Sequence, residues 1–68
     1  MPLKVKKLRA ALAKAGFNQR PGKGGHTFWT HVDLPGETVT ISGKDGDDAK
    51  SYQLKDVQDA LRLLGAKL

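Results

Sequence analysis

The residue best suited to chemistry in this sequence is His26, which directly follows Gly24 and Gly25 and has two cations, Arg20 and Lys23, shortly before it. An imidazole donates and accepts protons at neutral pH, and the cations can stabilise negative charge on phosphate oxygens. The two glycines have no side chain, so a ligand backbone can approach them closely. RNA carries its own nucleophile, the 2′-hydroxyl, so a proton acceptor, a proton donor and positive charge are the minimum for its cleavage without a metal ion. The pattern predicts a general acid/base at His26, and the alternative interpretation is an ordinary exposed histidine at the end of a strand.

Other kinds of catalytic or metal site have little support. The chain has no cysteine, which excludes disulfides, thiolate zinc sites and cysteine nucleophiles. His26 and His31 are five residues apart, so in a strand they point to opposite faces and are poorly placed to share a metal ion. The acidic segment 43–48 lacks the spacing and the closing glutamate of an EF-hand, which favours a solvated turn. We therefore expect no metal and no small-molecule cofactor.

Positive charge is concentrated in the first half of the chain. Residues 1–32 contain seven lysines and arginines and no acid, which gives +7, whereas residues 33–68 contain five cations and seven acids, which gives −2 and a total of +5. A one-sided positive surface attracts a polyanion, for which nucleic acid is the commonest candidate. We expect Lys7 to belong to an RNA-binding surface, and the alternative is a solubilising helix face.

The length of 68 residues leaves room for one small domain, predicted to span residues 1–68. A chain of this size buries only about 60% of its unfolded surface, so we expect any site to lie on the surface rather than in a deep cavity. No apolar run approaches the ~18 residues of a membrane helix, and the first residues do not resemble a signal peptide. The cytoplasm is the expected compartment, because small secreted domains usually depend on disulfides, and we expect no membrane partner.

Two segments show the periodicity of amphipathic helices. The first covers residues 4–15, after Pro2 and before Gly16, and its apolar stripe comprises Val5, Leu8, Leu12 and Ala15. The second starts near Ser51 or Asp56, each of which is a possible N-cap, and stops at Gly65. Its stripe comprises Leu54, Val57, Leu61 and Leu64.

Three extended segments lie between these helices. Residues 17–20 form a short run, residues 26–32 are rich in aromatic and β-branched side chains, and residues 37–42 alternate strictly, with Val39 and Ile41 on one face. The order α-β-β-β-α predicts an α+β fold. In this fold two helices cover one face of a three-stranded antiparallel sheet and leave the other face open.

The aromatic residues divide between core and surface in this scheme. Phe28 and Trp29 are neighbours in a strand, so they point to opposite faces. Because Phe28 shares the parity of Val32, we expect Phe28 to be buried and Trp29 to be partly exposed. An exposed Trp29 can stack on a base or pack against a partner. Tyr52 is expected beside the core.

The same residues resemble the HicA family, the mRNA-cleaving toxins of bacterial HicA–HicB toxin–antitoxin pairs, from about Lys4 to Leu68. Residues 4–8 with Leu12 and 15–17 look like the first helix of the family and its glycine–aromatic end. The closing helix is matched by Val57, Ala60, Leu61, Leu64 and Gly65. The signature strand, Gly-Ser-His in the family, is matched by Arg20, Gly24, Gly25, His26, Trp29 and His31.

This resemblance implies a fold similar to the double-stranded RNA-binding domain, cleavage of mRNA with His26 catalytic, and neutralisation by a HicB-like antitoxin that covers the site. We assign RNA contacts to Lys7, Arg20, Lys23, Gly24, Gly25 and Trp29. The sequence departs from the family at three places. Gly25 replaces a serine, residues 42–44 replace a Pro-x-His motif, and residues 55–56 replace a Gly-Thr pair.

Two other functions fit the same residues. One is an RNA-binding module with a fold like the double-stranded RNA-binding domain but without catalysis. The other is a protein-interaction domain whose basic half meets an acidic partner. The nuclease would cleave RNA, the RNA-binding module would bind RNA without cleaving it, and the protein-interaction domain would have negligible affinity for RNA.

Overall fold

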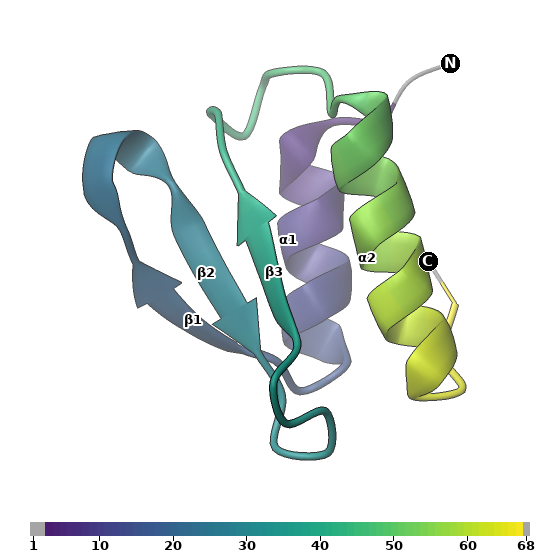
Figure 1. Ribbon diagram of the computed structural model, residues 1–68. Helices are drawn as coiled ribbons and strands as arrows, with labels where there is room; N and C mark the ends of the chain where they lie inside the picture. The colour runs from purple at the N-terminus through teal and green to yellow at the C-terminus, as the bar shows by residue number, and fades with distance from the viewer. Residues whose placement is uncertain (1–2, 68) are drawn as a thin grey trace.

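A pair of helices packs against one face of a three-stranded antiparallel sheet (Figure 1). The computed structural model describes residues 3–67, so Pro2, expected at the start of the first helix, lies outside the described residues. The molecule measures 18 Å along its shortest axis, as expected for one layer of helices on one sheet. The predicted α+β class is confirmed, and the likeness to the double-stranded RNA-binding domain stays a prediction with which this architecture is compatible.

The elements follow one another in the predicted order α-β-β-β-α. They are helix α1 (Val5–Lys14), strands β1 (Asn18–Pro21), β2 (Thr27–Thr30) and β3 (Thr38–Ile41), and helix α2 (Ser51–Leu63). A short 3₁₀ turn, η1 (Lys23–Gly25), joins β1 to β2. The strands lie in the order β1-β2-β3, so β2 is the central strand and β1 is an edge. Within residues 3–67, neither helix is long and apolar enough to cross a membrane.

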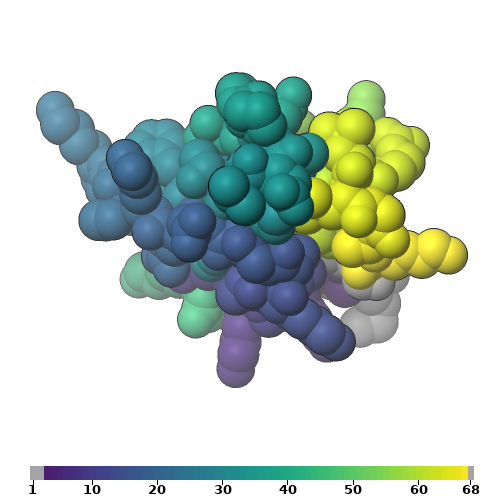
Figure 2. Space-filling view, turned by 90° about the horizontal axis from the view of Figure 1, so that it is seen from below, coloured from purple at the N-terminus to yellow at the C-terminus, as the bar shows by residue number. Residues whose placement is uncertain are grey.

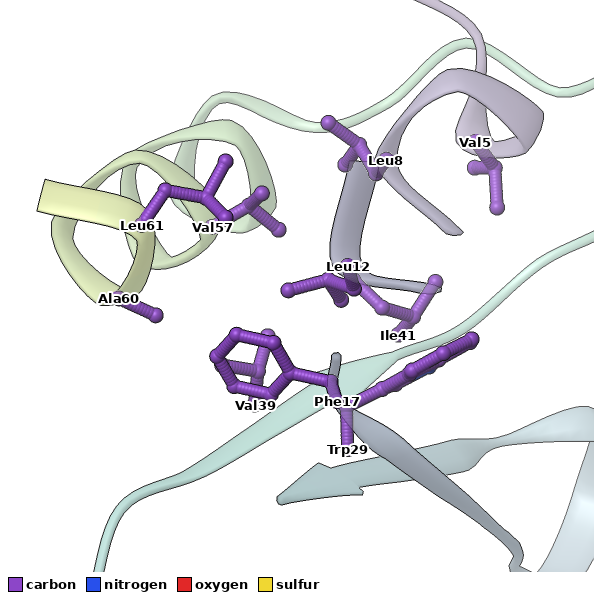
Figure 3. Close-up of a cluster of buried hydrophobic side chains, with 10 residues drawn as sticks. All are labelled: Val5, Leu8, Leu12, Phe17, Trp29, Val39, Ile41, Val57, Ala60 and Leu61. Carbon is purple, nitrogen blue, oxygen red and sulfur yellow. The ribbon is translucent and has the colours of Figure 1, made fainter. Parts of the chain in front are cut away.

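The hydrophobic core fills the space between the two layers (Figure 3). Helix α1 contributes Val5, Leu8 and Leu12, and helix α2 contributes Val57, Ala60 and Leu61. The sheet contributes Trp29, Val39 and Ile41, and Phe17 comes from the residue before β1. Each helix therefore buries the predicted apolar stripe, while Ala15, Leu54 and Leu64 pack at its margin. Tyr52 was wrongly expected beside this core. It is 56% exposed, because the buried side of α2 starts with Gln53 and Val57 instead.

The structure reverses the predicted burial of the two aromatic residues of β2. Trp29 is 4% exposed and Phe28 is 39% exposed. The prediction was wrong because it extended the strand to Val32, whereas β2 ends at Thr30 and Val32 lies in an exposed turn. Trp29 pairs with the buried Val39 of β3. Since residues paired across two strands share a face of the sheet, Trp29 points into the core.

The indole of Trp29 has a hydrogen-bond partner inside the core. Its Nε1–H donates to Oγ1 of Thr27 at 3.0 Å, and the Thr27 hydroxyl donates to the carbonyl oxygen of Ile41 at 3.2 Å. Buried polar groups cost stability when they are left unpaired, so this relay lets β2 turn both Thr27 and Trp29 inward.

Besides the core contacts, a buried side chain of α2, Gln53, bonds the start of the helix to Ser42, the residue after β3. The helix begins at Ser51 with Lys50 as its N-cap, so neither Ser51 nor Asp56 is the N-cap. Instead, the N–H of Lys50 donates to Oε1 of Gln53 at 3.0 Å. Nε2 of Gln53 in turn donates to the carbonyl and hydroxyl oxygens of Ser42, at 3.1 and 3.0 Å.

The acidic segment 43–48 packs against the start of α1. The N–H groups of Val5 and Lys6 donate to backbone carbonyl oxygens of this segment at 2.9 and 3.2 Å. The Arg9 guanidinium donates to the Asp45 carboxylate at 2.9 Å. The first N–H groups of a helix have no partner within the helix, so the segment supplies acceptors that α1 needs. It also offsets part of the positive charge of α1.

The reversed burial predicts very different costs for truncating the two aromatic residues. Trp29→Ala is expected to lower the free energy of unfolding by about 3–5 kcal/mol, because it leaves a cavity in the core. Phe28→Ala is expected to lower it by about 1 kcal/mol or less. Urea denaturation of the two variants measures both values, and equal losses would contradict the register described here.

Candidate functional site

The β1–β2 hairpin carries its chemically active side chains on the face of the sheet opposite the helices. Arg20 lies across from Phe28, and the pairing continues past the strands because the N–H of Gly22 donates to the His26 carbonyl oxygen at 2.8 Å. Side chains alternate along extended backbone, so His26, Phe28 and Arg20 share the open face while Trp29 points inward. Arg20 and His26 are diagonal neighbours, about 7–8 Å apart between Cα atoms.

The imidazole of His26 is open to solvent at the end of this hairpin. Among the described residues no hydrogen bond restrains it, in contrast to the ring of His31. Its Cδ2 lies beside Gly24, where a Cβ would be only 3.7 Å away. Gly24 and Gly25 have φ angles of 64° and 80°, which residues with a side chain rarely adopt, so the turn depends on glycine at both positions. The ring and the turn before it are exposed to solvent.

The hairpin that carries His26 also carries two cations and no acid. Arg20 and Lys23 are exposed, and residues 17–32 contain no acid. Within residues 3–67 neither cation forms an ion pair, whereas Lys4 and Arg9 of the first helical segment pair with Asp48 and Asp45. Figure 2 shows the hairpin (blue) at one end of the molecule and the end of α2 with the segment after it (yellow) at the other.

The second histidine of the signature, His31, has a structural role. Its Nδ1 accepts the N–H of Asp33 at 3.0 Å, so the proton of the neutral ring lies on Nε2, which donates to the Ala15 carbonyl oxygen at 3.1 Å. The ring packs edge-on against Phe17 with centroids 5.1 Å apart, and its side chain is 11% exposed. His31 thus fastens the end of α1 to the end of β2 and leaves the site to His26.

Two of the predicted RNA-binding residues lie outside this arrangement. Lys7 is on the outer surface of the helical layer, where it lines a shallow groove with Leu3, Ala10, Ala11 and Lys14. The sheet therefore separates Lys7 from His26. Trp29 is in the core, and a ring that is 4% exposed offers no face to a nucleobase. The structure brings together Arg20, Lys23, Gly24, Gly25 and His26.

Phe28 takes the exposed aromatic position that was assigned to Trp29. Its ring lies over Gly22, where a Cβ would be 2.6 Å from Cε2 and 3.2 Å from Cζ of the ring. Glycine is needed there for space rather than for backbone conformation, since its φ is −119°. The alternation of Val39 and Ile41 contained the signal for this orientation, but using it requires the register between β2 and β3.

The different surroundings of the two histidines predict different effects on stability. His31→Ala is expected to lower the free energy of unfolding by about 1–3 kcal/mol, because it removes two hydrogen bonds and leaves the Ala15 carbonyl and the Asp33 N–H without their partner. His26→Ala is expected to change it by no more than about 0.5 kcal/mol. Thermal or urea unfolding of both variants tests this. A larger loss for His26→Ala would show that its ring is packed.

Comparison with known proteins connects this geometry to one family. The family model described as "HicA toxin of bacterial toxin-antitoxin" matches residues 5–66, which include both helices, all three strands and the hairpin with His26. No curated protein and no solved structure matches the chain.

Proposed function

Because the chain belongs to the HicA toxin family, we propose that it is the toxin of a type II toxin–antitoxin pair and cleaves mRNA as a metal-independent endoribonuclease. The observation that carries the nuclease assignment is the exposed, unrestrained imidazole of His26 on a cationic hairpin without acids. A histidine that transfers protons needs access to its substrate and at least one ring nitrogen that no structural hydrogen bond occupies. His26 meets both conditions, whereas His31 meets neither.

The proposed reaction uses the 2′-hydroxyl of the RNA as the nucleophile. The 2′-oxygen forms a bond to phosphorus while the bond from phosphorus to the 5′-oxygen breaks. His26 accepts the proton of the 2′-hydroxyl and returns a proton to the departing 5′-oxygen. The products are a 2′,3′-cyclic phosphate and a 5′-hydroxyl. Arg20 and Lys23 bind the phosphate and stabilise the negative charge that grows on its oxygens.

The proposed partners are mRNA and a HicB-like antitoxin in the cytoplasm. Membership of a toxin–antitoxin family implies an antitoxin. A site on the surface of a thin domain is blocked most simply by a protein that covers the hairpin, and an acidic surface matches its charge. The remaining cations of α1, which include Lys7, contribute long-range attraction for RNA.

Replacement of His26 tests the catalytic assignment. With chelator present, His26→Ala is expected to reduce the rate of RNA cleavage by about 10²–10⁴-fold, because general acid–base catalysis contributes that much. Growth arrest on expression is expected to disappear in the same variant. His31→Gln, measured where it is folded, serves as the matched control and is expected to retain cleavage.

The other outcomes separate the alternatives. If His26→Ala cleaves RNA at the wild-type rate, His26 has no role in catalysis. Equal RNA binding by both forms without cleavage would identify a non-catalytic RNA-binding module. Negligible RNA affinity together with a salt-sensitive protein complex would identify a protein-interaction domain.

The role of the hairpin cations is tested by single charge removals. Arg20→Ala and Lys23→Ala are each expected to lower kcat/KM by about tenfold, because each removes a phosphate contact next to His26. Lys55→Ala removes the same charge from the exposed side of α2 and is expected to have little effect. Cleavage is measured with a labelled RNA at fixed ionic strength, since phosphate contacts weaken with salt. An equal effect of all three variants would indicate diffuse attraction instead of a defined site.

A further inference from the structure

The open face of the sheet has a single large apolar side chain, that of Phe28. Its six outward positions on the strands are Asn18, Arg20, Phe28, Thr30, Thr38 and Thr40. An isolated exposed hydrophobic residue is common on protein surfaces and by itself indicates nothing. The position of Phe28 is more informative, because it lies two residues from His26 on the same strand and directly across from Arg20.

The absence of a side chain at Gly22 leaves room for the Phe28 ring at the end of the hairpin that carries His26. The ring atoms Cε2 and Cζ occupy the space that a side chain at residue 22 would need, and Gly22 is hydrogen-bonded to His26 across the hairpin. The ring therefore lies over the residue that pairs with the His26 backbone, while 39% of Phe28 remains exposed. A rigid aromatic ring in this place is prepared to bind a flat ligand at low cost in conformational entropy.

We propose that Phe28 stacks on an unpaired nucleobase and thereby makes single-stranded RNA the substrate, with the adjoining phosphate beside His26. This inference rests on the proposed function. Residues two apart on a strand are separated by roughly 7 Å, so a base on Phe28 belongs to a nucleotide next to the phosphate at His26. Arg20 and Lys23 then follow the RNA backbone as a cationic groove does in single-strand binding proteins.

Single-stranded RNA fits this surface better than duplex RNA does. The bases of a duplex are stacked on one another, so none can place its face on a protein ring without leaving the helix. An aromatic ring between phosphate-binding cations is the combination by which proteins bind unpaired nucleic acid. The hydroxyl groups of Thr30, Thr38 and Thr40 continue the face as hydrogen-bonding groups beyond the ring.

The test measures RNA affinity in a His26→Ala background, so that the RNA stays intact. Fluorescence anisotropy compares single-stranded RNA, duplex RNA and inorganic polyphosphate at one salt concentration. Adding Phe28→Ala or Phe28→Leu is expected to weaken binding of single-stranded RNA by roughly 5- to 100-fold, as expected for the loss of one stacked base. Binding of polyphosphate, which has no bases, is expected to stay unchanged. Phe28→Trp is expected to retain binding.

Tyr52→Ala is the matched control, because it removes an exposed aromatic ring from the helical layer. It is expected to leave RNA binding unchanged. Circular dichroism checks that each variant is folded. Because Phe28 points outward, its substitutions are expected to leave the fold intact.

Several results would overturn the inference. These are unchanged RNA binding by Phe28→Ala, an equal loss of RNA and polyphosphate binding, or tighter binding of duplex than of single-stranded RNA by the parent. Unchanged RNA binding with a weakened complex with the co-expressed antitoxin would place Phe28 in a protein interface instead. If the parent binds no RNA at all, the proposed function itself fails, which is distinguishable from a failure of the stacking role.

Discussion

The pairing of β2 with β3 is the constraint on which the rest of the molecule depends. Val39 and Ile41 alternate with threonines along β3, so their side chains must face the helices. Because Trp29 and Thr27 lie opposite these two residues, they are drawn to the same face, and the indole N–H is satisfied there by the Thr27 hydroxyl. Burial of one large aromatic ring and one hydrogen-bond relay then determines the orientation of every other residue in the hairpin.

That orientation separates the structural residues from the chemical ones. His31 lies just beyond the end of β2 and its two ring nitrogens are engaged with backbone groups, so it holds α1 against the sheet. His26 lies just before β2, after the glycine turn, and no hydrogen bond within residues 3–67 holds its ring. Two histidines five residues apart thus have opposite environments, because one is at the edge of the core and the other is at the free end of a hairpin.

The distribution of charge follows the same division. The acidic segment after β3 pairs with Lys4, just before α1, and with Arg9 in the helix. The same segment supplies acceptors to the first turn of α1. The hairpin receives no such compensation, since it contains no acid. The uncompensated positive charge near a proton-transfer group is therefore at Arg20 and Lys23, even though α1 contains more cations. In the proposed mechanism, this charge attracts the phosphate to the place where His26 would act on it.

The sequence by itself determined the order of the elements and the apolar stripes of both helices, because helical periodicity and strict alternation are local patterns. It also determined the grouping of Arg20, Lys23, Gly24, Gly25 and His26, since all five lie within seven consecutive residues. The sequence placed the start of α2 near Ser51 or Asp56, and the helix begins at Ser51, but the N-cap is Lys50. The side chain that accepts from the Lys50 N–H is the buried Gln53, which is also bonded to Ser42, and no local pattern predicts that contact. Only the tertiary structure decided which aromatic residue is exposed, since the face of a strand depends on its partner and on where it ends. It also decided that Lys7 lies on the outside of the helical layer, away from His26 on the open face of the sheet. The packing of α1 on the sheet determines where that helix face lies, and the local sequence does not.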